Sequence, residues 1–231
     1  MKRRHSLYVS AAGAALAACI PAAQKTAVPG YTPALRPPLT YVALGASDAA
    51  GVGVEHPQRD SWVAVLAQRV PQPARLVNLG IPGVRLFEAL EVELPPALEA
   101  RPDLITIWLV VNDILTGISL DHYRADLDRL LGTLRARTGA RIAIGNVPNA
   151  PDSLPYLGLP PAERRVVADS WNAAIAAVAL VHGVTLVDLF RRWPLWDHPE
   201  YIGPDRLHPT VVGYQALAET FHAVLTEARI V

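Results

Sequence analysis

The chain has 231 residues, of which 51% are hydrophobic and 18% are charged, so a folded domain with a core is expected rather than a disordered chain. Lysine plus arginine and aspartate plus glutamate number 21 each, and this balance provides no basic surface to attract nucleic acid. The single cysteine excludes an internal disulfide framework and a multi-cysteine metal site.

The first residues have the pattern of an export signal. A basic start, Met1–Arg4, precedes a small apolar run, Leu7–Ala18, which is too short to span a bilayer. The run closes as Leu16-Ala-Ala-Cys19, which resembles the lipobox of bacterial lipoproteins. The resemblance implies a signal peptide over residues 1–18 and a lipid anchor on Cys19, which would hold the exported protein at a membrane of the cell envelope. An ordinary secretory signal that is cut elsewhere is the alternative.

The segment after the cysteine separates this signal from the rest of the chain. Residues 19–38 are rich in alanine, proline and threonine and show no apolar periodicity, which is typical of an extended tether. A single folded domain is therefore predicted over residues 39–231, and its oligomeric state is left open.

Within that domain, apolar runs of strand length alternate with helical patterns. Strands are predicted over Leu39–Leu44, Arg75–Leu79, Leu104–Val111, Arg141–Val147 and Val184–Leu189. Helices are predicted over Ser61–Val70, Leu86–Leu98, His122–Thr138, Ala162–His182 and about Thr210–Ala228. This alternation predicts an α/β fold with a central parallel sheet of five strands, covered by helices on both faces.

The first predicted strand leads into a serine with small neighbours. Ser47 follows Gly45-Ala46, just where the backbone must leave the sheet, and Ala49 and Ala50 come soon after it. Ligands of open α/β sheets bind outside the carboxyl ends of the strands, so this is where a nucleophile would be presented.

A serine nucleophile needs a base, a group that orients the base, and donors for the oxyanion. The best candidate base is His208, and Asp205 lies three residues before it, within reach of the imidazole. Pro209 fits the first turn of the last helix, which would place His208 at the rim of the sheet. Alone, an Asp-x-x-His-Pro pattern is also explained by helix capping.

Two further segments supply candidate oxyanion donors at strand ends. Gly80 follows the second predicted strand, and Asn112 follows the third. Taken singly, each residue is explained equally well by the backbone geometry of a turn. Four polar segments that all fall at the carboxyl ends of strands, or at the start of the last helix, are harder to explain as turns alone.

These four blocks, in this order, resemble those of the SGNH (GDSL-type) hydrolase family, from about Leu39 to the end of the chain. The resemblance implies a three-layer α/β/α, flavodoxin-like fold and a catalytic triad of Ser47, His208 and Asp205. It also implies a serine esterase or acylhydrolase that cleaves carboxylic esters through an acyl-enzyme intermediate.

The family resemblance further implies an oxyanion hole made by the Ser47 backbone N–H, the Gly80 backbone N–H and the Asn112 side chain. Two positions depart from the family pattern. The first block usually reads Gly-Asp-Ser, whereas Ala46 precedes the serine here, and Val110 stands where the third block usually has glycine. Neither departure removes a reacting group, and Val110 is expected to alter packing beside the acyl pocket.

Several alternatives stay open at this point. The ester is a short-chain ester, a lysophospholipid or an O-acetyl group on envelope polysaccharide. The rival function is a non-catalytic surface lipoprotein that binds glycan or lipid on the same fold. Trp193, Trp196, Tyr201 and Tyr156 either form the substrate rim or cover the edge of the core. No cofactor and no metal are expected, because no second histidine or carboxylate has metal-ligand spacing.

Overall fold

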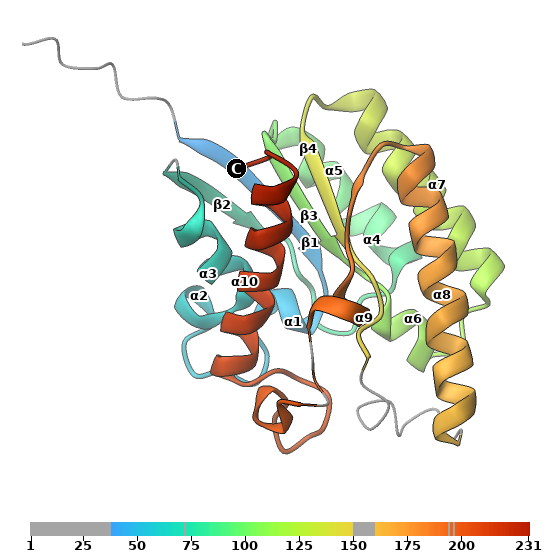
Figure 1. Cartoon of the computed structure of the whole chain (residues 1–231). Coiled ribbons are helices and arrows are strands. Elements are labelled where there is room, and N and C mark those ends of the chain that lie inside the picture. The colour runs from blue at the N-terminus through green and yellow to red at the C-terminus, as the bar shows by residue number, and fades with distance from the viewer. Residues whose placement is uncertain (1–37, 72, 150–159, 194, 196) are drawn as a thin grey trace, which may run out of the picture. The chain divides into compact units, whose positions relative to one another are not determined.

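A computed structural model shows the arrangement of the elements (Figure 1) and describes residues 38–71, 73–149, 160–193, 195 and 197–231. The predicted signal peptide, Cys19 and nearly all of the predicted tether lie outside these residues, as do Tyr156 and Trp196. The structural statements below concern the described residues, which all belong to one unit, Arg36–Val231.

A parallel sheet of five strands forms the centre, in the order β2-β1-β3-β4-β5. The strands are β1 (Leu39–Gly45), β2 (Ala74–Asn78), β3 (Leu104–Trp108), β4 (Arg141–Gly145) and β5 (Thr185–Val187). This is the flavodoxin-like strand order, in which ligands bind where the chain crosses from one side of β1 to the other. The predicted fold class is therefore confirmed.

Four strands end earlier than predicted, the second by one residue, at Asn78. The strand predicted to reach Val111 stops at Trp108, because Val111 already begins the short helix α6 (Val111–Leu115). The fourth and fifth strands likewise end at Gly145 and Val187. All five residues of β3 are buried, which explains why its sequence reads as an almost uninterrupted apolar run.

Helices cover both faces of the sheet (Figure 1). On one face α3 (Trp62–Arg69) packs against α10 (Val211–Glu227). On the other face α7 (Leu120–Arg137) packs against α8 (Pro161–Val181), α4 (Leu86–Val92) and α5 (Leu94–Glu99). The remaining helical segments are α1 (Ser47–Ala50), α2 (Pro57–Asp60), α9 (Leu189–Arg192) and a 3-10 turn at Pro199–Tyr201.

The helix predicted over Leu86–Leu98 is two helices, α4 (Leu86–Val92) and α5 (Leu94–Glu99). They meet at Glu93, whose side chain is fully buried and accepts a hydrogen bond from the Gly45 N–H. Two prolines in the first turn of α5 have no N–H to continue the hydrogen bonding of α4. The break therefore turns one carboxyl group inward, under the end of β1.

Aromatic pairs pack in the core beside the sheet. The Trp62 ring stacks on Phe221, with centroids 4.4 Å apart, and Trp193 meets Trp108 edge-on at 5.8 Å. Each such pair contributes roughly 0.5–1.5 kcal/mol beyond its buried area. Trp193 is only 1% exposed, so it belongs to the core, whereas Tyr201 is partly buried and stacks on His198. Within the described part of the chain, no helix has the length and apolarity to cross a membrane.

Candidate active site

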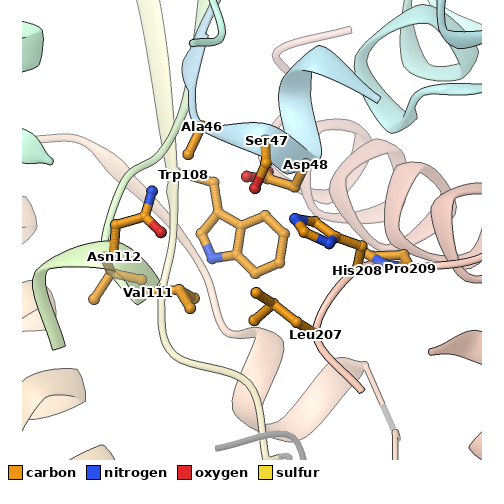
Figure 2. Close-up of a pocket in the computed structure, with 10 residues that line it drawn as sticks. Ala46, Ser47, Asp48, Trp108, Val111, Asn112, Leu207, His208 and Pro209 are labelled. Atoms are coloured by element: carbon orange, nitrogen blue, oxygen red, sulfur yellow. The ribbon is translucent and has the colours of Figure 1, made fainter. Parts of the chain in front are cut away.

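A small cleft of about 40 Å³ opens at the carboxyl ends of β1 and β3 (Figure 2). Three of the predicted site residues, Ser47, Asn112 and His208, line it together although they are far apart in the sequence. The complete lining is Ala46, Ser47, Asp48, Trp108, Val110, Val111, Asn112, Leu207, His208 and Pro209. The structure thus brings the candidate nucleophile, the candidate base and a side-chain amide to one place.

Ser47 is the first residue of α1, immediately past the end of β1. Its carbonyl accepts the Val52 N–H at 2.8 Å, which closes the turn that follows. Its N–H lies at the start of a helix, where backbone donors have no intrahelical acceptor. Ser47 therefore brings to the cleft both a hydroxyl and a backbone N–H that has no acceptor within the helix.

Asp205 holds His208 in two ways. Its Oδ2 lies 2.6 Å from Nδ1 of the imidazole, while its Oδ1 accepts the backbone N–H groups of Leu207 and His208, both at 3.0 Å. Partial burial raises the pKa of Asp205, but the hydrogen bonds from His208 and the two backbone donors lower it further, so its pKa lies below the usual value. An ionised Asp205 keeps the proton on Nδ1 and leaves Nε2 as the basic nitrogen.

The segment that carries His208 does not begin the last helix directly. Thr210 is the N-cap of α10 and accepts the Gly213 N–H, so Pro209 precedes the cap and does not occupy the first turn. Pro209 instead pairs with Ile202 in an isolated antiparallel bridge. Among the described hydrogen bonds none joins Ser47 Oγ to His208, and such catalytic contacts often tighten only when substrate binds.

Asn112 and its neighbour Asp113 are both fixed by hydrogen bonds to the segment that leads into α4. Its Nδ2 donates to the Val84 carbonyl at 2.9 Å, which uses one of the two amide hydrogens. The next residue, Asp113, is buried and accepts the Leu86 N–H at the start of α4. Burial raises the pKa of Asp113 to about 6, although the Leu86 N–H opposes the rise. This fixed position leaves the second amide hydrogen of Asn112 available to the cleft.

Gly80 is close to the nucleophile but is not among the residues that line the cleft. A side chain at this position would lie 2.7 Å from Cβ of Ala49 and 3.0 Å from the Ala46 carbonyl, so only glycine fits. The Gly80 N–H donates to Oδ1 of Asn78 at 3.0 Å, and Nδ2 of Asn78 donates to the Ala49 carbonyl at 2.7 Å. Asn78 therefore ties the Gly80 turn to α1, and the Gly80 donor already has an acceptor.

A second glycine in the same loop lies beside Asn112. Gly83 has φ of 82° and directly precedes Val84, whose carbonyl holds the Asn112 amide. The Val84 N–H is bonded to the Ile81 carbonyl at 3.1 Å, whereas no described residue accepts the Gly83 N–H. The loop thus has a backbone donor at Gly83, which is exposed and is not among the residues that line the cleft.

Two carboxyl groups lie near the nucleophile: the partly buried Asp48 lines the cleft, and the fully buried Glu93 lies under the end of β1. Asp48 accepts the indole N–H of Trp62 at 3.1 Å, and burial raises its pKa to about 6. Burial also raises the pKa of Glu93 to about 9, because the Gly45 N–H offsets only part of the burial effect and the Asp48 carboxylate adds to the rise. No described residue provides a partner for Oε1 of Glu93. Glu93 is therefore protonated at neutral pH and braces the end of β1.

Other histidines lie away from the cleft. His122 pairs with Asp126, and His182 with Asp128, both on the helical layer of α7 and α8. His56 and His198 do not line the cleft. In the described ranges, no group of three or more histidine, cysteine or acidic residues is arranged to hold a metal ion.

The sequence matches the GDSL-like Lipase/Acylhydrolase family over residues 43–216, the part that carries Ser47, Asn112 and His208. Among solved structures, the crystal structure of TesA is similar with a TM-score of 0.69 and 25% identity, over 81% of this chain and 98% of that chain. No curated protein is similar enough in sequence to be matched.

Two more distant structures have the same fold. The lipase/acylhydrolase from Enterococcus faecalis has a TM-score of 0.68 and 18% identity, over 82% of this chain and 96% of its own. Axe2, an acetylxylan esterase from Geobacillus stearothermophilus, has a TM-score of 0.66 and 20% identity, over 81% and 94%.

Proposed function

Because this chain belongs to the GDSL-like lipase/acylhydrolase family and is a carboxylic ester hydrolase, we propose that Ser47, His208 and Asp205 are its catalytic triad. The observation that carries the proposal is the 2.6 Å contact between Asp205 and Nδ1 of His208. His208 lines the same cleft as Ser47. A nucleophile, a base and a group that orients the base are the three parts that acyl transfer through serine requires.

In the proposed reaction, Nε2 of His208 takes the proton from Ser47 as Oγ attacks the ester carbonyl carbon. The imidazolium is stabilised by Asp205 and then protonates the leaving alcohol, so the C–O bond breaks and an acyl-enzyme ester forms on Ser47. Water, deprotonated by the same nitrogen, attacks this ester and releases the carboxylic acid and free Ser47.

The negative charge that develops on the carbonyl oxygen needs fixed donors. We assign the Ser47 N–H and the free amide hydrogen of Asn112, which both belong to the lining of the cleft. For the third donor the family resemblance implies the Gly80 N–H, which lies beside α1 and donates to Asn78 in this structure. Each oxyanion donor contributes about 10²–10³ in kcat in comparable sites.

A pre-steady-state experiment tests the acyl-enzyme. Mixing the protein with excess p-nitrophenyl acetate is expected to release p-nitrophenol in a burst equal to the concentration of active sites, provided that deacylation is slower than acylation. Ser47→Ala should show neither burst nor turnover while keeping the wild-type circular dichroism spectrum. A folded wild-type protein that hydrolyses no ester would instead favour the non-catalytic glycan- or lipid-binding function.

We also propose that the protein is an exported lipoprotein anchored through Cys19. The support is the lipobox-like Leu16-Ala-Ala-Cys19 and the basic start before it, all outside the described residues. Expression in a bacterial host with a labelled fatty acid tests this directly. Wild type should incorporate the label and sediment with membranes, and Cys19→Ser should lose both; an unlabelled wild-type protein would contradict the anchor.

A further inference from the structure

The floor of the cleft is a tryptophan, the last residue of β3. Figure 2 shows the Trp108 indole in the middle of the lining, between His208 on one side and Asn112 on the other. Trp108 lies opposite Gly45 in the sheet register, so its position follows directly from the pairing of β1 with β3. An acyl group on Ser47 whose oxygen faces Asn112 must therefore rest against this ring.

Three contacts prevent the indole from turning away. Its Nε1–H donates to the Asn146 carbonyl at 3.1 Å, and its ring meets that of Trp193 at an interplanar angle of 80°. A side chain at Gly145 would lie only 3.0 Å from Cδ1 of Trp108, so the ring packs directly on the β4 backbone. Trp108 is 6% exposed, and the surface that it shows belongs to the cleft.

The space above the ring is small, and much of its lining is apolar. The cleft holds about 40 Å³, enough for roughly three water molecules at the ~10–15 Å³ of such space that each one needs. Val110 and Val111 stand where β3 turns into α6, and Leu207 closes the side next to His208. A short acyl group fits this volume and lining, whereas an extended alkyl chain is too long for it.

We propose that Trp108 sets the acyl specificity of the enzyme and restricts it to acetyl and similarly short esters. This inference rests on the proposed role of Ser47 as the nucleophile. It concerns the acid part of the ester only, and it selects acetyl esters over lysophospholipids among the substrates left open by the sequence.

The test compares kcat/KM for the p-nitrophenyl esters of acetate, butyrate and hexanoate in wild type, Trp108→Leu and Trp108→Phe. Wild type is expected to prefer acetate over hexanoate by at least about 10-fold, a typical effect of excess methylenes in a tight pocket. Trp108→Leu should shift the hexanoate-to-acetate ratio by about 10-fold or more toward hexanoate. Trp108→Phe keeps more of the packing and should shift the ratio in the same direction by less.

Trp171→Leu is the matched control, because Trp171 is also 6% exposed but packs on Tyr123, between α8 and α7. It should lower the unfolding temperature like Trp108→Leu and leave the chain-length ratio unchanged. A wild type that prefers hexanoate, or two Trp108 variants with the wild-type ratio, would overturn the inference while Ser47-dependent hydrolysis persists. Absence of any Ser47-dependent hydrolysis would overturn the proposed function itself.

Discussion

One carboxylate, that of Asp205, binds both the ring and the backbone of His208: Oδ2 lies 2.6 Å from Nδ1, and Oδ1 lies 3.0 Å from the backbone nitrogen. The side chain of Asp205 is 49% exposed and that of His208 is 18% exposed, so this pair lies at the edge of the cleft rather than in the core. The pair therefore contributes to catalysis by fixing the tautomer and the orientation of the His208 imidazole.

Replacing Asp205 with asparagine separates these two functions. Asp205→Asn keeps an oxygen for the backbone N–H groups but presents an amide to Nδ1, which favours the wrong imidazole tautomer. We expect kcat to fall by about 10⁴, the order seen for this change in the Ser-His-Asp triad of serine proteases, with little change in KM. Asp169→Asn, at a surface carboxylate paired with Arg165, is the control and should keep full activity. Equal activities of the two variants would remove Asp205 from the triad.

Asn112 is expected to act in the transition state and not in substrate binding. Asn112→Ala should lower kcat by about 10²–10³ and leave KM nearly unchanged, as for other oxyanion donors. Because the amide also holds the Val84 carbonyl, thermal unfolding of the variant must be measured alongside its kinetics. A loss that appears only in KM would show that Asn112 binds substrate without stabilising the oxyanion.

The stability of the protein should depend on pH through Glu93. Burial raises the pKa of Glu93 to about 9 from its ordinary value of 4.5, so the folded state keeps a proton that the unfolded chain loses between these two values. The stabilisation is complete below about pH 4.5 and is lost as pH rises toward 9. The raised pKa values of Asp48 and Asp113, both about 6, also make the folded state less stable as pH rises, but only up to about pH 6. Glu93 therefore dominates above pH 6.5.

Urea unfolding between pH 6.5 and 8.5 tests this dependence. Wild type should lose stability across the range, whereas Glu93→Gln, which cannot ionise and still accepts the Gly45 N–H, should show a flatter profile. Glu88→Gln is the control, because bonding to Arg85 lowers the pKa of Glu88 to about 2 and leaves it ionised throughout the range. The account of Glu93 fails if wild type and Glu93→Gln have the same slope.

Periodicity and strand-end polarity predicted the sheet, its five strands and the meeting of Ser47, Asn112 and His208 in one cleft. These features depend on local pattern and on the shared edge of a parallel sheet. The details that depend on contacts between distant residues were not predictable in the same way. Asn78 accepts the Gly80 N–H, and Glu93, at the break in a predicted helix, reaches Gly45, 48 residues away.

The role of Trp108 was not predictable from the sequence for the same reason. The predicted strand Leu104–Val111 places Trp108 in mid-strand, whereas Trp108 ends β3, and its role as the floor depends on Asn146, 38 residues further on, and on Trp193. The sequence did contain one usable signal for Glu93: an acidic residue in an apolar helical pattern, directly before a Leu-Pro-Pro segment. A buried carboxyl group at a helix break is the structural outcome of that conflict.

Covalent labelling of Ser47 tests the central claim most directly. The protein is treated with a fluorophosphonate probe, and intact and peptide mass spectrometry locate the adduct. We expect one phosphonyl group per chain, on Ser47, with slower labelling of Asp205→Asn and none of Ser47→Ala. A folded wild-type protein that remains unlabelled, or an adduct on a different serine, would contradict the assignment of Ser47 as the nucleophile.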